Sequence, residues 1–286
     1  MKTIPGAQLT VFRALLGLYL AAHFLHLLPW GAELFSAAGV LPDPALNPTW
    51  PTRVLLPFPL GWWDSPGAVT AVLVAGTVLA LAFAAGIHRR PAAALLWLVW
   101  ASLFARNNLI ANPSLPYVGL LLLLTLLIPV GEPLTLLPRR HRHREDWFFP
   151  ASVYQVAWLL LMAGYTYSGI VKLASPSWVD GTALAHLLAN PLARDGLLRD
   201  LLLALPDGLL RLATWGALAV EVLALPLALW RRTRPAIWLA TGALQLGILG
   251  VVAFADLTIG MLLAHLFVFD PDWLPARRRV GARQLV

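Results

Sequence analysis

Apolar stretches of about twenty residues recur along this chain, separated by short polar or proline-rich connectors. A helix of that length crosses the ~30 Å hydrocarbon core of a bilayer, because each residue adds ~1.5 Å. The pattern predicts eight membrane-spanning helices, the last of them short. They cover residues 9–28, 67–87, 91–110, 117–137, 151–173, 209–230, 236–254 and 257–269. We therefore expect an all-α fold, a polytopic transmembrane helical bundle.

Proline and glycine mark the connectors between these segments. Residues 29–66 are rich in Pro, Trp and Gly and are expected to form a loop. Pro91 suits the start of a helix, whereas Asn112-Pro113 and Pro138 interrupt one. Because apolar segments fill the chain almost end to end, we expect a single membrane domain over residues 1–286.

One connector has a helical pattern of its own. Between the fifth and sixth segments, leucines recur at helical spacing, and charged residues occupy the other face. The leucines are Leu184, Leu187, Leu188, Leu197, Leu198, Leu201, Leu202 and Leu205, and the charged residues are Arg194, Asp195, Arg199 and Asp200. The pattern is typical of an amphipathic segment that lies on the outer membrane face.

Composition and charge agree with a membrane protein. The chain is 59% hydrophobic and 12% charged, whereas soluble domains are about a quarter charged. Its net charge of +7 could suggest nucleic acid, but the arginines form short runs between apolar segments, near residues 89–90, 139–144, 231–234 and 277–283. Such runs mark cytoplasmic loops. We therefore expect a multi-pass inner (plasma) membrane protein with both termini in the cytoplasm, membrane lipids as partners and no nucleic acid.

Lys172 is the most distinctive ionisable residue. The chain has nineteen arginines but only two lysines, and the other, Lys2, is explained by the cytoplasmic N-terminus. Lys172 ends the fifth segment on the outer side. An amine held partly in apolar surroundings can act as a base near neutral pH, which arginine cannot. The alternative is a lysine that only anchors the end of a helix by reaching to the interface.

Further polar residues lie in or beside the apolar segments. Glu221 is inside the sixth segment, where a carboxylate must be paired or protonated, and the alternative to a functional role is a structural pair with an Arg or Asn. Arg106, Asn107 and Asn108 end the third segment on the outer side. They could hold a polar head group or an anionic intermediate, or they could tie down the helix end.

The histidines carry weaker signals. His23 and His26 share a helix face, but two histidines without a third ligand are weak evidence for metal, so no metal site is predicted. His265, in the eighth segment, could pack or could pair with Glu221. The chain has no cysteine, which excludes disulfides and thiolate chemistry.

The segment from Tyr165 to Gly181 resembles the HTTM family of bacterial membrane proteins, which shares its membrane domain with vitamin K-dependent gamma-glutamyl carboxylase. The resemblance is carried by residues 167–173, Tyr-Ser-Gly-Ile-Val-Lys-Leu, and 178–181, Trp-Val-Asp-Gly. The order of Arg13, residues 39–42, residues 106–108 and Glu221 also agrees. Two positions depart from the pattern, since Leu109 and Gln245 stand where histidines are expected.

The resemblance implies an enzyme of the carboxylase type, or a quinol-epoxidising enzyme, that acts on a lipid-soluble quinol at the outer side. Its cofactors would be vitamin K hydroquinone or another quinol, with O2 and CO2. Lys172 would be the base and Glu221 would modulate it. Arg106, Asn107 and Asn108 would orient the polar head, and Tyr167, Trp178 and Asp180 would complete the substrate site. The rival hypothesis is a non-catalytic membrane protein that binds lipid or a peptide or partner protein on the outer side, with a role in export or maturation.

Overall fold

The computed structural model describes residues 5–43, 46, 58–133, 147 and 149–273, and these residues are helical apart from connectors and one isolated β-bridge. Eight longer helices are α1 (Gly6–Leu27), α3 (Pro66–Ala84), α4 (Arg89–Arg106), α5 (Leu115–Leu127), α6 (Ala151–Lys172), α10 (Asp207–Ala228), α11 (Arg234–Val251) and α12 (Asp256–Phe267). The shorter elements are α2 (Gly31–Phe35), α7 (Pro176–Val179), α8 (Ala183–Ala189), α9 (Leu197–Leu203) and the 3-10 turns η3 (Pro59–Gly61) and η4 (Pro271–Trp273). The prediction of an all-α fold is confirmed for this part of the chain.

Each of the eight predicted segments overlaps one of the longer helices, but several ends differ. The largest difference is at α5, which ends at Leu127 rather than near residue 137. Ile128 is extended because it precedes Pro129, whose ring disfavours helical backbone at the preceding residue. Residues 134–137 of that segment lie outside the described residues. So do the arginine runs near residues 139–144 and 277–283.

Several helices begin at a proline or after a capping side chain, and both signals can be recognised in the sequence. At α3, Pro66 takes the first position and the Ser65 hydroxyl accepts a hydrogen bond from the Ala68 N–H at 3.3 Å. Proline also lies at the start of α5, α7 and α11. The turn from α3 to α4 is tight and passes through His88, which has a positive φ of 46°.

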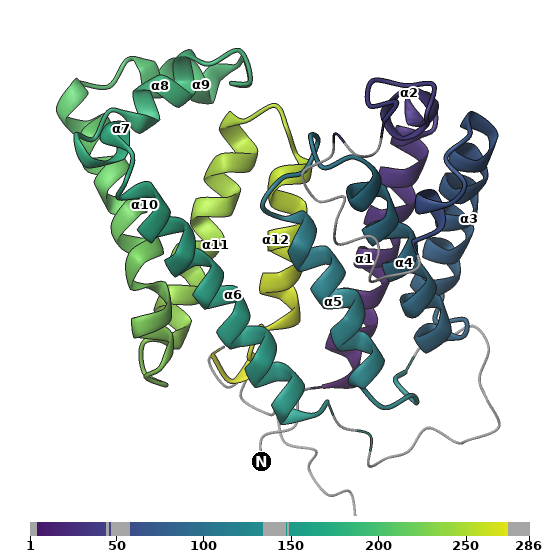
Figure 1. The fold of residues 1–286 in the computed structure, drawn as a ribbon. Coiled ribbons are helices and arrows are strands. Elements are labelled where there is room, and N and C mark those ends of the chain that lie inside the picture. The colour runs from purple at the N-terminus through teal and green to yellow at the C-terminus, as the bar shows by residue number, and fades with distance from the viewer. Residues whose placement is uncertain (1–4, 44–45, 47–57, 134–146, 148, 274–286) are drawn as a thin grey trace, which may run out of the picture.

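The eight longer helices alternate in direction (Figure 1). The start of α1 and the η4 turn lie at the lower end of the view, and α2, α7, α8 and α9 lie at the upper end. By length and composition α1, α3 and α10 are long and apolar enough to cross a membrane, whereas α5 and α12 are apolar but shorter, with 13 and 12 residues.

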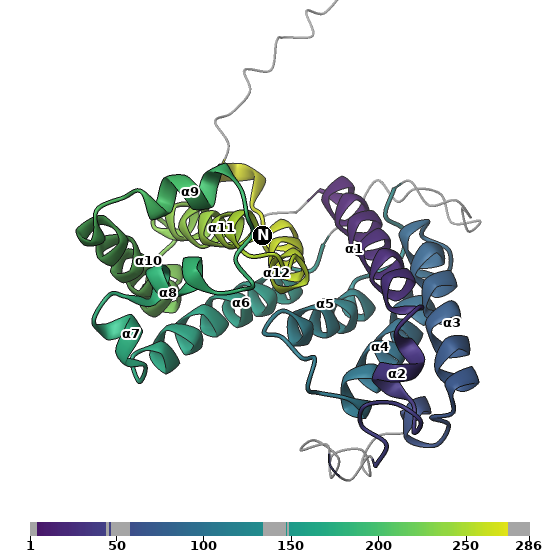
Figure 2. The ribbon, with the colours of Figure 1, turned by 90° about the horizontal axis from the view of Figure 1, so that it is seen from above.

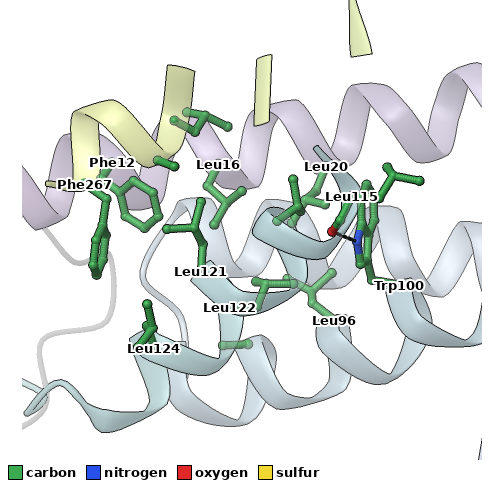
Figure 3. Packing of buried hydrophobic residues seen from close by; sticks show 14 of the residues in the cluster. Phe12, Leu16, Leu20, Leu96, Trp100, Leu115, Leu121, Leu122, Leu124 and Phe267 are labelled. Carbon is green, nitrogen blue, oxygen red and sulfur yellow. Dashed lines mark hydrogen bonds between the residues drawn. The ribbon is translucent and has the colours of Figure 1, made fainter. Parts of the chain in front are cut away.

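The main hydrophobic core contains residues of all eight longer helices, and α1, α3, α4, α5 and α12 form one group within it. Phe12 and Leu16 of α1 meet Leu121 of α5 and Phe267 of α12, and the Trp100 indole N–H donates to the Leu115 carbonyl at 3.0 Å (Figure 3). Seen from above, α12 lies between this group and the helices α6, α10 and α11 (Figure 2). The position of α12 therefore connects the two sets of helices.

The predicted amphipathic segment is two helices rather than one. A connector over residues 190–196 separates α8 from α9 and forms the β-bridge between Ala193 and Val252. Leu188 is buried against Leu210 and Val252, whereas Leu197 and Leu201 stay exposed. Helix α9 thus keeps an exposed apolar surface.

A buried charge cluster ties the lower ends of α1, α3, α4 and α5 together. Glu132 lies 2.8 Å from Arg89 and 3.8 Å from Arg13, and all three side chains are buried. Arg13 also donates to the last carbonyls of α3, at Phe83 and Ala84, and Arg89 donates to the carbonyls of Ile128 and Pro129 after α5. The guanidinium groups thereby cap helix ends whose carbonyls have no helical partner. The sequence analysis did not identify Glu132.

We predict that Glu132→Gln lowers the free energy of unfolding by about 3–5 kcal/mol, because it leaves two buried guanidinium groups with no carboxylate. Thermal unfolding of the purified protein in detergent would measure the loss. Glu33→Gln is the matched control, since Glu33 is exposed, and its effect should stay within about 0.5 kcal/mol. Equal midpoints for the two variants would contradict a stabilising role of the cluster.

Candidate functional site

The last two turns of α6 are in close backbone contact with the second half of α10. A Cβ atom on Gly169 would lie only 2.7 Å from the backbone nitrogen of Val222, so only glycine permits this approach. One turn earlier, the Thr166 hydroxyl lies 3.2 Å from the Glu221 carbonyl and accepts a hydrogen bond from the Leu225 N–H at 2.9 Å. These contacts fix the position of Glu221 relative to α6.

Lys172 and Glu221 form an ion pair across this contact. The Lys172 Nζ lies 2.6 Å from both carboxylate oxygens, and the Ser168 hydroxyl lies 3.3 Å from Glu221 Oε2. The Lys172 side chain is 24% exposed and that of Glu221 is 9% exposed. The pair is therefore mostly desolvated but still reachable from outside.

Trp178 covers the ammonium group on its other side. The Nζ atom lies 4.3 Å from the centre of the Trp178 ring, which is a cation–π distance. The short helix α7 that carries Trp178 is held on α10, because the Trp215 indole N–H donates to the Val179 carbonyl at 3.0 Å. Gly181 follows with a φ of +84° and packs against Arg211 and Trp215. The sequence from Lys172 to Gly181 thus folds back over the ion pair.

Two other predicted substrate residues lie outside this contact. Tyr167 is 72% exposed, and Asp180 bonds locally to Thr182. Hydrogen bonds from the Thr182 hydroxyl and backbone N–H lower the pKa of the Asp180 carboxyl, so it is ionised at neutral pH. Neither side chain has a described contact with Lys172 or Glu221.

The structure does not bring Arg106, Asn107 and Asn108 to the ion pair. They end α4, which packs against α3, α5 and η3, whereas α6 packs chiefly on α10. The upper ends of α4 and α6 are well separated in Figure 1. The hypothesis that Arg106 and Asn108 share one cavity with Lys172 and Glu221 is therefore not supported. The physical reason is the tilt of α6, whose upper end diverges from the first set of helices.

The end of α4 forms a separate polar group. The buried Arg106 donates from Nε to Asp64 at 3.2 Å, while its Nη1 and Nη2 atoms have no hydrogen-bond partner in the described part of the chain. The Asn107 amide donates to the Leu34 carbonyl at 2.8 Å, which supports the interpretation that it ties down the helix end. Asp64 is a partner that the sequence analysis missed, because it lies in a loop with no recognisable motif.

A third set of polar side chains lies between α6, α11 and α12. The buried Tyr165 hydroxyl lies near the Gln245 amide, yet within the described part of the chain neither that hydroxyl nor the Gln245 carbonyl oxygen has a hydrogen bond of ordinary geometry. The suggestion that His265 pairs with Glu221 is wrong. Its ring nitrogens instead lie 2.8 Å from the Met261 carbonyl and 3.0 Å from the Thr241 hydroxyl, because α12 carries it toward α11.

The described residues contain no group of three or more metal-ligating side chains. His26 is exposed, whereas His23 contacts Asp256. Sequence reasoning noted His23 but missed this partner, because 233 residues separate the two positions.

We predict that Gly169→Ala separates α6 from α10 and weakens the ion pair, since the added methyl group would meet backbone rather than a movable side chain. The expected cost is about 1–3 kcal/mol. Spin labels at Tyr167→Cys and Leu223→Cys would report the wider spacing, as the chain has no other cysteine. Gly216→Ala in α10, which has open space around it, should leave spacing and stability unchanged; the same result for Gly169→Ala would contradict the close contact.

Compared with models of protein families, with curated proteins and with solved structures, the chain matches none. The comparisons therefore assign no family and no reaction. The Lys172–Glu221 pair, reachable from outside and covered by Trp178, is the arrangement on which the functional interpretation rests.

Proposed function

We propose that the chain crosses the inner membrane eight times, with both termini in the cytoplasm. The alternating direction of the eight longer helices supports this topology (Figure 1). It brings Arg89, Arg90 and Arg234 to the end of the molecule opposite α7, α8 and α9, which agrees with the preference of arginine for cytoplasmic loops. Large apolar side chains such as Val78, Leu127 and Leu239 are exposed, as expected for surfaces that face lipid.

This topology predicts that reporter domains fused after Arg90, Arg144 and Arg234 are cytoplasmic, whereas those fused after Leu41 or Asn190 are outside. Paired reporters that are active on opposite sides of the membrane would measure each position. A cytoplasmic signal after Asn190 would contradict the proposed orientation, because α7, α8 and α9 would then face the wrong side.

We propose further that the protein is a membrane enzyme that removes a proton from the hydroxyl group of a lipid-soluble substrate, a quinol in particular. The observation that carries this proposal is the Lys172–Glu221 pair at 2.6 Å, which is partly exposed at the outer end of α6. An ionisable pair at the membrane interface is costly to maintain, and such groups commonly serve function. The resemblance of residues 165–181 to the HTTM family and to vitamin K-dependent gamma-glutamyl carboxylase supports the same chemistry.

The pair can accept one proton in balanced steps. Lys172 first passes a proton from Nζ to the Glu221 carboxylate, which leaves a neutral amine beside a carboxylic acid. The amine then takes the proton of the substrate hydroxyl and becomes an ammonium again. The substrate oxygen becomes negative and receives hydrogen bonds from the ammonium. Trp178 supports each cationic state through its ring and shields it from water.

The side chains of the ion pair and Trp178 suit the hydroxyl group and the ring of a quinol. The ammonium and carboxylate suit an acidic hydroxyl, and the ring of Trp178 suits an aromatic neighbour. A bound quinol would supply electrons for reaction with O2. The chain's own residues would bind the hydroxyl, take up its proton and stabilise the negative oxygen.

The decisive variant is Lys172→Arg. Arginine keeps the positive charge and can bond both oxygens of Glu221, yet it stays protonated at any working pH. We expect quinol-dependent oxygen consumption in membranes to fall by about 10²–10⁴-fold, the usual contribution of a general base, while the thermal midpoint stays close to wild type. Glu221→Gln should also lose activity, because an amide cannot store the proton.

Arg199→Lys is the control for this experiment, since it makes the reverse exchange in the outer connector, where Arg199 bonds Asp195. It should retain activity. Wild-type activity in Lys172→Arg would overturn the role of Lys172 as a base. If Lys172→Leu then lowered stability, the pair would be a structural tie, as in the rival hypothesis of a non-catalytic lipid- or peptide-binding protein.

A further inference from the structure

A second group of ionisable side chains lies where α12 begins beside α1. The Tyr19 hydroxyl donates to Asp256 Oδ1 at 2.5 Å, and His23 Nδ1 lies 3.1 Å from the same oxygen. The His23 side chain is 11% exposed and that of Asp256 is 20% exposed. The group is thus nearly buried, and its helices are not those that carry Lys172 and Glu221.

This geometry fixes which histidine nitrogen is available. An ionised carboxylate only accepts hydrogen bonds, so His23 Nδ1 must carry the hydrogen that it shares with Asp256. In the neutral ring, Nε2 is then a bare acceptor. Asp256 lies in the first turn of α12, where the helix dipole favours its negative charge. Asp256 therefore orients His23 as a carboxylate orients a proton-accepting histidine in many enzymes.

The Nε2 atom of His23 is buried and has no hydrogen-bond partner among the described residues. His265 provides the contrast, because both of its ring nitrogens are bonded within the protein. A buried acceptor without a partner destabilises the fold unless a ligand or water supplies the hydrogen bond. The orientation of His23 and its open acceptor together indicate a ligand site.

The surroundings of His23 indicate the kind of ligand. The rings of Trp100, Phe24 and Tyr19 lie 4.9, 6.0 and 6.0 Å from the His23 ring, between centres. Among the described residues, Asn112 Nδ2 is a second buried atom without a hydrogen-bond partner, and the Ser114 hydroxyl joins Asn112 Oδ1 to the Asp256 carbonyl. An open acceptor with aromatic rings beside it suits an amphiphilic aromatic molecule with a hydroxyl group. A metal is disfavoured because no third ligand is present among the described residues.

We propose that His23, oriented by Asp256 and Tyr19, binds the hydroxyl group of an amphiphilic aromatic ligand through Nε2. The hydroxyl donates its hydrogen bond to Nε2, so that His23 is placed to take up that proton and to return it. This site is separate from the Lys172–Glu221 pair and does not depend on the function proposed for that pair.

The test uses the full chain in lipid nanodiscs with 15N-labelled histidine and NMR detection. The probe is 4-butylphenol, and its methyl ether, 4-butylanisole, is the matched control that lacks the hydroxyl hydrogen. We expect a bare Nε2 and a protonated Nδ1 for His23, and a saturable shift of the Nε2 signal with the phenol alone. Loss of the signal in His23→Gln assigns it to His23. His26 is exposed and lies three residues away, so His26→Gln should leave phenol binding intact.

Asp256→Asn tests the orientation of His23. Because it removes the charged partner of Nδ1, we expect a mixture of tautomers and at least a roughly tenfold weaker affinity for the phenol. Three results would overturn the proposal: a hydrogen on Nε2 in the wild type, equal shifts with both probes, or no shift with the phenol. Tyr19→Phe keeps the ring and should weaken binding less than Asp256→Asn, and the opposite order would exclude Asp256 as the main orienting group.

Discussion

Ionised side chains between apolar helices are stable only when another charge or a carbonyl group meets them, and this requirement decides how the helices of this protein can lie. At the lower end, Glu132 must reach both Arg13 and Arg89, which holds α1 and α4 to the loop after α5. At the upper end, Glu221 must reach Lys172, which holds α10 to α6. Each group of charges thus fixes the relative positions of its helices, which apolar contacts alone would not fix.

The two clusters differ in a way that matters for function. The three side chains of the lower cluster are buried, and its arginines also donate hydrogen bonds to backbone carbonyls. The geometry of this cluster is that of a structural tie between helix ends. The Lys172–Glu221 pair keeps part of its surface open and has an aromatic ring as its third neighbour. This partly open geometry supports the proposal that the pair takes up a proton from a bound substrate.

The molecule therefore contains separate polar groups on separate helices. Lys172 and Glu221 belong to α6 and α10, His23 and Asp256 to α1 and α12, and Arg106 to the end of α4. The tilt of α6 keeps the first group apart from the third (Figure 1). Helix α12 lies between the helices of the first group and those of the third group. It packs on α1 and α5 on one side and on α11 on the other.

The sequence by itself determined the helical character of the chain and the approximate position of every longer helix. Runs of apolar residues and prolines at helix starts are local signals, so they need no tertiary structure. It also singled out Lys172 and Glu221, because an ionisable residue inside an apolar segment is conspicuous wherever the chain folds. The early end of α5 at Leu127 was overlooked, although Pro129 is a local signal as well.

Only the tertiary structure decided which of these residues meet. Lys172 and Glu221 are 49 positions apart, and Gly169 has to admit the backbone of α10 before their side chains can touch. Glu132, Asp64 and Asp256 lie at helix ends or in connectors, where a carboxylate is ordinary and nothing local marks it as a partner. Their partners were fixed by helix tilt and packing, which depend on contacts between distant segments and leave no periodic trace in the sequence.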